Sequence, residues 1–330
     1  MRETAQRSGS QNNYDSTEEC EGDLMREESI VVGRNTEYPL NGRIVLPATS
    51  KQRYSAVVFV HGSGSSNMDE KVFRLTPFRD LAEGLAARGI ASIRYDKRSF
   101  VHAKKMMKQT ITVREETIED ALRATELLRS HPNIDPDRVF IVGHSMGAML
   151  APRIDAEGGD YRGLILMAGS PYRLEDIFVR QVNQSGGSAG IMKLIAGLED
   201  KIFSKKFDGL YEMPDEEAKK KKFGGGTTLY YFKEAGQKTA VDYLAGSEKP
   251  VLIMQGGMDF QCLADVDYEG FRELLKDRKN TEFRLYEDLN HIFVKGIYND
   301  ISKAMKEYRV EQHIGDEVID DIAEFIKKCE

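Results

Sequence analysis

The chain has 330 residues, of which 40% are hydrophobic and 31% charged, and its formal net charge is -7. This length fits one large domain with an insertion, or two ordinary domains. The acidic balance argues against a nucleic-acid-binding protein, which usually carries a basic face, and no stretch approaches the roughly 20 apolar residues of a membrane span. Three scattered cysteines (Cys20, Cys262, Cys329) suit neither a disulfide framework nor a metal site. We therefore expect a soluble, cytoplasmic protein without a metal ion.

The first 27 residues are polar and rich in Glu, Ser, Asn and Gln. Such a segment buries too little apolar surface to offset the entropy that its ordering would cost, and it lacks the apolar core and cleavage site of a secretory signal. We therefore expect residues 1–27 to be disordered or only loosely attached. The short β-branched runs SIVVG and GRIVLP that follow predict a hairpin-like start to a sheet.

From residue 55 onward, apolar runs alternate with amphipathic stretches. SAVVFVHG is apolar throughout, which is typical of a strand buried on both faces of a parallel sheet. Further strands are predicted in IASIRYD, RVFIVG and GLILMAG, and helices in PFRDLAEGLAARG, TVREETIEDALRATELLRSH and SMGAMLAPRI. This alternation predicts βαβ units, and therefore an α/β fold with a mostly parallel central sheet and helices on both faces.

The alternation stops after Pro171 and returns with the apolar run KPVLIMQGG. Residues 172–247 have a helix-and-loop pattern, so we expect them to form a helical cap or lid over the carboxyl edge of the sheet. A helix near 265–277, the strand TEFRLYE and a C-terminal helix then complete the core, which we expect to comprise residues 28–171 and 248–330.

Ser145 lies in the pattern G-x-S-x-G (Gly143–Gly147), between a predicted strand and a predicted helix. Ligands of parallel α/β sheets bind at the carboxyl ends of the strands, where this serine is expected. Glycines on either side permit a sharp strand-to-helix turn that exposes the hydroxyl. The pattern therefore indicates a nucleophile, the alternative being a tight turn without catalytic function.

A serine hydroxyl needs a base to remove its proton, and the chain has six histidines. His291 follows the last predicted strand, at the same edge as Ser145, and is the best candidate. Three other histidines lie in connections between predicted elements: His102, His131 and His313. Of these, His102 either lines a pocket or faces water.

The base in turn needs an acceptor that orients it and offsets its developing charge. Asp259 follows the buried run VLIMQGG, again at the same edge. Asp265, at the start of a predicted helix, and Asp288, near His291 in sequence, are its rivals. The triad Ser145, Asp259, His291 has the chain order of the α/β-hydrolase arrangement.

An oxyanion needs preorganised backbone donors. We expect them to be the N–H of Met146, at the start of the helix after Ser145, and the N–H of Ser63, in the glycine-rich loop HGSGSSNMDE. Further candidates for substrate contact are His61 and Gly62 of the same loop, His144 beside the serine, and Phe178 in the insertion.

Three motifs give the chain a family resemblance. H-G-S-G followed by acidic residues stands at His61–Gly64 with Asp69 and Glu70, R-Y-D-K-R at Arg94–Arg98, and G-H-S-x-G at Gly143–Gly147. With these motifs the chain resembles the serine α/β-hydrolases, in particular bacterial cytosolic esterases and lipases, over about 40–171 and 248–328. It departs from the D-R-D that often follows H-G-S-G in relatives, since it has Asn67-Met68-Asp69.

The resemblance implies hydrolysis of a carboxylic ester through an acyl-serine, without a cofactor. The apolar residues of the insertion favour a small-molecule substrate with an apolar group. Thioesterase, amidase or peptidase, and acyltransferase activities use the same triad and stay open, as do a non-catalytic binding module and a homodimer.

Overall fold

The computed structural model describes residues 14–18, 25–49, 53–184, 205–224, 226–298 and 303–330. A single large sheet forms its centre, and its nine described strands have the order β1-β2-β3-β5-β4-β6-β7-β10-β11. The strands are β1 (Tyr14–Glu18), β2 (Met25–Val32), β3 (Leu40–Pro47), β4 (Tyr54–Val60), β5 (Ala91–Tyr95), β6 (Ile134–His144), β7 (Leu164–Met167), β10 (Val251–Gly256) and β11 (Thr281–Tyr286).

The kind of strand pairing changes once across the sheet, at β5. β1, β2 and β3 pair antiparallel, as do β3 and β5, whereas all pairs from β5 to β11 are parallel. The strands β4, β7 and β10 are buried along their whole length, as central strands covered on both faces must be. The mostly parallel sheet predicted from the sequence is confirmed.

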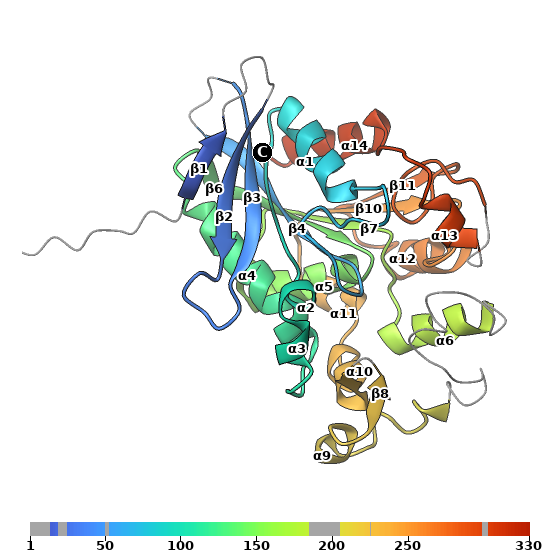
Figure 1. Ribbon diagram of the computed structural model, residues 1–330. Helices are drawn as coiled ribbons and strands as arrows, with labels where there is room; N and C mark the ends of the chain where they lie inside the picture. Colours follow the sequence, from blue (N-terminus) through green and yellow to red (C-terminus); the bar gives the residue numbers. More distant parts are fainter. Residues whose placement is uncertain (1–13, 19–24, 50–52, 185–204, 225, 299–302) are drawn as a thin grey trace, which may run out of the picture.

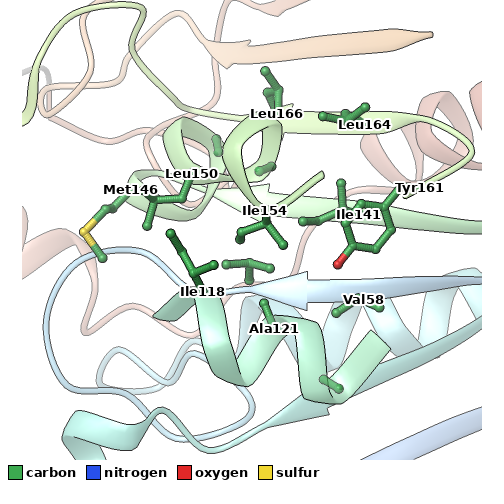
Figure 2. Packing of buried hydrophobic residues seen from close by; sticks show 14 of the residues in the cluster. Val58, Ile118, Ala121, Ile141, Met146, Leu150, Ile154, Tyr161, Leu164 and Leu166 are labelled. Atoms are coloured by element: carbon green, nitrogen blue, oxygen red, sulfur yellow. The ribbon is translucent and has the colours of Figure 1, made fainter. Parts of the chain in front are cut away.

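Two hydrophobic cores lie on opposite faces of this sheet. On one face, α1 (Pro77–Ala87) and α14 (Asp316–Lys328) pack against Val57 and Phe59 of β4. On the other, α4 (Glu119–Arg129) and α5 (Met146–Ile154) pack against Val58 and Ile141, as Figure 2 shows. Alternate residues of a strand point to opposite faces, so each central strand serves both cores.

The remaining core helices are short and join the strands at their ends. None of the described helices is long and apolar enough to cross a bilayer. These short core helices are α2 (Arg98–Val101), α3 (Ala103–Met106), α12 (Glu269–Leu274) and α13 (Ala304–Glu307), with the π-helical turns η1 (Arg114–Ile118), η2 (Asp155–Gly159) and η3 (Ala264–Tyr268).

Between β7 and β10 the chain leaves the sheet. Its described part forms α6 (Leu174–Gln184), α9 (Asp215–Ala218), α10 (Leu229–Ala235) and α11 (Ala240–Leu244), of which α6, α9 and α10 project from the sheet in Figure 1. The sequence predicted helices and loops here, and the structure adds a small antiparallel pair, β8 (Lys222–Gly224) with β9 (Thr227–Thr228). Residues 185–204 of the predicted cap lie outside the described residues.

The N-terminal segment differs from the sequence prediction where the structure describes it. Tyr14–Glu18 form strand β1 rather than a disordered stretch, and β2 already begins at Met25. An edge strand is held by backbone hydrogen bonds to one neighbour, here β2, and so it needs few apolar side chains. The other residues of the predicted 1–27 segment, 1–13 and 19–24, lie outside the described part of the chain.

Candidate active site

Ser145 occupies a strained turn between β6 and α5. Its φ of 54° and ψ of -118° are unusual for a residue other than glycine. A Cβ at Gly143 would lie 2.3 Å from the carbonyl O of Gly147, and a Cβ at Gly147 would lie 2.1 Å from the carbonyl O of Val60. Glycines are therefore required on both sides of the serine, because neighbouring backbone occupies the space of a side chain.

His291 and Asp259 come together from the loops after two neighbouring parallel strands, β11 and β10. Nδ1 of His291 lies 2.8 Å from Oδ2 of Asp259, and both side chains are buried. The backbone N–H groups of Gln261 and Cys262 donate to Oδ1 of Asp259, at 2.7 and 2.9 Å, and fix the carboxylate. Because an ionised carboxylate can only accept, Nδ1 of His291 carries the proton and Nε2 is left as an acceptor.

The rival residues lie elsewhere. Asp265 and Asp288 are exposed, and His131 is paired with Glu28. His102 contacts a backbone carbonyl in the loop before β3, and the exposed His313 pairs with an aspartate of α1. Of the candidates weighed from the sequence, the structure brings Asp259 and His291 together at the sheet edge that carries Ser145.

His144, next to Ser145, contacts the site from behind. Its Nε2 lies 2.9 Å from the carbonyl O of His291, and its Nδ1 lies 2.9 Å from Oε2 of Glu70. Burial by itself would lower the pKa of His144, but the Glu70 carboxylate and the His291 carbonyl raise it above its usual value. Acceptors at both nitrogens favour the protonated ring, and both nitrogens face the protein, so the structure does not make His144 the substrate contact that the sequence suggested.

The glycine-rich loop after β4 is held by buried charges at Gly62. The N–H of Gly62 donates to Oε1 of Glu70 at 2.7 Å, and its carbonyl O accepts from Nζ of Lys97, also at 2.7 Å. Both backbone groups of Gly62 therefore face the protein, and neither is available to a substrate. The next residue, Ser63, is exposed and lines the cavity described below.

His61 is likewise turned into the protein. It is 2% exposed, its Nε2 lies 3.0 Å from the carbonyl O of Asn67, and its ring packs against Phe78. Burial lowers the pKa of His61 to about 4, so the ring is neutral at neutral pH. The sequence-based suggestion that His61 contacts substrate is wrong in this structure, because its ring lies in the core behind the loop.

A cavity of about 340 Å³ opens beside Ser63 and Met146, the two expected oxyanion donors. Phe178 of α6, a candidate for substrate contact, lines it. Much of the rest of the wall is apolar. It comes from α3 and the segment after it (Met106, Met107, Ile111), from the β8–β9 pair (Phe223) and from α10 (Phe232). The only charged residue in its described lining is Glu116, whose Oε1 is paired with Lys97 at 2.8 Å and whose Oε2 accepts from Tyr231 at 2.6 Å.

Sequence reasoning missed the buried charges of this site. In the sequence, Glu70 and Lys97 stand out only as parts of motifs, and Glu116 and Tyr231 do not stand out at all. The available signal for Lys97 was its position two residues after the buried strand β5; the other three residues do not directly follow a strand. In the described part of the chain, no three His, Cys, Asp or Glu side chains are grouped so that they could hold a metal ion.

The fold and this site together define a class of protein. A strained serine between strand and helix, with a histidine–aspartate pair after two later strands of the same parallel sheet, is characteristic of α/β-hydrolases. Residues 57–294 match the sequence profile of the Alpha/beta hydrolase family, and the chain belongs to this family.

One curated relative is similar along most of the chain. It is Esterase EstD of Thermotoga maritima, which is 33% identical over 291 residues, or 88% of this chain. The chain spans 66% of the length of EstD.

Solved structures share the fold at low sequence identity. Est1E from Butyrivibrio proteoclasticus is 16% identical, with a TM-score of 0.55 over 91% of this chain and 98% of its own. The acylaminoacyl peptidase of Pyrococcus horikoshii is also 16% identical, with a TM-score of 0.58 over 93% of this chain and 42% of its own.

Proposed function

We propose that the protein hydrolyses carboxylic esters of small molecules through an acyl intermediate on Ser145. The observation that carries the proposal is the 2.8 Å contact between His291 and Asp259, at the sheet edge where the strained turn presents Ser145. The identity with Esterase EstD supports an ester as the substrate.

The reaction follows from these groups. Oγ of Ser145 attacks the ester carbonyl while Nε2 of His291 takes its proton, and Asp259 stabilises the imidazolium that forms. The N–H groups of Ser63 and Met146 donate to the oxyanion of the tetrahedral intermediate. His291 then gives its proton to the leaving alcohol. Water repeats the sequence on the acyl-serine, with His291 as base, and releases the acid.

The cavity beside Ser63 and Met146 accommodates an apolar group of the substrate. Its wall includes Phe178 and Phe232, and Glu116, the one charged residue among the described residues that line it, is already paired. We assign residues 172–247 the role of a cap, since α6 and α10 contribute to this wall. A charged substrate group would lose its hydration there without gaining a partner, so a neutral group is favoured.

A series of p-nitrophenyl esters of increasing chain length tests the proposal. We expect Ser145→Ala to lower kcat by at least about 10⁴-fold, whereas the exposed Ser130→Ala is the matched control and retains activity. A fluorophosphonate should label the wild type at Ser145 and leave Ser145→Ala unlabelled. Turnover that survives Ser145→Ala would exclude the mechanism. If matched thioesters or amides were hydrolysed faster than the esters, the protein would be assigned that activity in place of ester hydrolysis.

A further inference from the structure

A buried ammonium group holds the peptide unit that carries the expected oxyanion donor. Lys97, directly after Asp96 and strand β5, is 2% exposed, and its Nζ donates to the carbonyl O of Gly62 at 2.7 Å. Its backbone N–H donates to the carbonyl O of Ser66 at 3.0 Å, on the far side of the same loop turn. Lys97 thus contacts the glycine-rich loop twice, once through its side chain and once through its backbone.

The geometry of the peptide bond links this contact to Ser63. The carbonyl of Gly62 and the N–H of Ser63 belong to one planar trans unit, in which they point in opposite directions. Because the Gly62 oxygen points to Nζ of Lys97, the Ser63 N–H points away from Lys97, and Ser63 itself is exposed and lines the cavity. The preceding unit is fixed too, because the Gly62 N–H donates to Glu70.

We propose that Lys97 is a positioning residue that orients and polarises the Ser63 N–H for the oxyanion; this rests on the proposed function. A cation at the carbonyl oxygen draws electron density from the amide and makes its N–H a stronger donor. Lys97 does not touch the substrate and acts only through the Gly62–Ser63 peptide.

Glu116 and Tyr231 keep the ammonium in place. Oε1 of Glu116 lies 2.8 Å from Nζ of Lys97 and offsets its charge, which would be costly to bury alone. The hydroxyl of Tyr231, on α10, donates to the other oxygen of Glu116. Glu116 and Tyr231 both line the cavity, so the wall of the substrate cavity and the support of the oxyanion donor share these residues.

Two other members of the R-Y-D-K-R motif hold more distant parts of the loop. Oδ1 of Asp96 accepts from the N–H of Met68 at 2.8 Å, and Nε of Arg94 donates to Asp69 at 2.9 Å. Lys97 is the member of the motif whose side chain reaches the Gly62–Ser63 peptide. This gives the motif a role that its sequence did not suggest.

Kinetics of the full-length Lys97→Met variant test the proposal. We expect kcat for a p-nitrophenyl ester to fall by about 10- to 100-fold, which is at most the effect of removing a whole oxyanion donor. KM should change by less than about threefold. A trifluoromethyl ketone, which forms an oxyanion on Ser145, should lose affinity by the same factor as kcat. The unreactive alcohol of the same carbon skeleton should bind as before.

Three further variants separate positioning from general damage. Lys233→Met removes another buried lysine that also contacts a backbone carbonyl and a carboxylate, those of Met213 and Asp215, and it should keep the wild-type kcat. Lys97→Met/Glu116→Gln leaves no unpaired buried charge and should retain the thermal stability while still losing kcat. Lys97→Arg, which keeps the charge, should recover part of kcat.

The proposal is overturned if the double variant folds and has the wild-type kcat and ketone affinity. It is also overturned if the alcohol loses as much affinity as the ketone, because that pattern indicates general distortion. Failure of the wild type to hydrolyse esters or to bind the ketone would instead contradict the proposed function, and this outcome is distinct from a Lys97 variant that behaves like the wild type.

Discussion

The ring of His144 hydrogen-bonds to the backbone carbonyl of His291, at 2.9 Å, although the two residues are 147 positions apart in the chain. The turn that presents Ser145 and the loop that carries His291 are thus joined directly. The opposite nitrogen of His144 faces Glu70, whose other oxygen accepts from the N–H of Gly62. Three loops of the candidate site therefore meet at one buried ion pair.

This ion pair predicts a pH dependence of stability. The pKa of His144 is raised above its ordinary value of 6.5, so its contribution is complete below pH 6.5 and is lost as the pH rises through the raised value. Burial would raise the pKa of Glu70, but the imidazolium lowers it below 4.5, so its contribution is present above pH 4.5 and is lost on acidification below that. In urea titrations, the free energy of unfolding lost by His144→Gln should be largest between pH 4.5 and 6.5. A loss that grows steadily above pH 6.5 would contradict the assignment.

Replacing Asp259 by asparagine should reverse the tautomer of His291. The backbone donors at Oδ1 hold the asparagine oxygen, which turns its amide NH₂ toward Nδ1 of His291. Nδ1 must then accept and Nε2 carries the proton, so it cannot serve as the base. We expect kcat to fall by about 10³- to 10⁴-fold, as measured with a p-nitrophenyl ester. The exposed Asp265→Asn is the control, and an equal loss there would refute the specific role of Asp259.

Gly147→Ala should destabilise the fold itself. The added methyl group would lie 2.1 Å from a backbone oxygen of β4, which cannot move without disturbing the central sheet. We expect the free energy of unfolding to fall by about 3 kcal/mol or more. At Gly246, the nearest atom to an added Cβ is 3.8 Å away, so Gly246→Ala should change the free energy of unfolding by less than about 0.5 kcal/mol. Urea denaturation of both variants provides the test, and similar stabilities would be inconsistent with the steric argument.

Arg98 and Asp120 form a buried bidentate pair between the segment after β5 and helix α4. Nε and an Nη of Arg98 donate to the two carboxylate oxygens, at 2.8 and 2.6 Å, and both residues are 2% exposed. Arg98→Leu leaves the carboxylate without its main partner, and we expect a loss of about 3 kcal/mol. Arg98→Leu/Asp120→Leu should recover most of it. Thermal denaturation decides the question, and a double variant no better than the single one would contradict it.

Phe178→Ala should shift the chain-length preference. The ring lines the cavity and packs against Phe223 and Phe232, so its loss enlarges the space for an apolar substrate group. We expect the ratio of kcat/KM for long over short p-nitrophenyl esters to rise by about tenfold. Phe100→Ala, at a side chain that is 52% exposed, should leave the ratio unchanged. An unaltered optimum for Phe178→Ala would remove the cavity from the proposed binding site.

The sequence predicted those features that depend on local pattern. Apolar runs identified the buried strands that precede Ser145 and Asp259, and His291 lies in the loop after the predicted strand TEFRLYE. Side-chain pairing across the fold leaves no local pattern. Nothing adjacent to Lys97 in sequence indicates that it meets Gly62 and Glu116, and the backbone pairing that holds β1 needs no distinctive side chains.

The position of the insertion has a consequence for how this fold can diversify. β7 and β10, the strands on either side of it, are direct neighbours in the sheet, with Leu164 opposite Val251 and Met167 opposite Met254. The chain therefore leaves and re-enters the sheet across one gap between paired strands, and the register of the sheet is set without any residue of the intervening segment. Exchanging that segment can reshape the cavity around Phe178 while the strands before Ser145 and Asp259 keep their alignment, provided that the new segment supplies a donor to Glu116 in place of Tyr231.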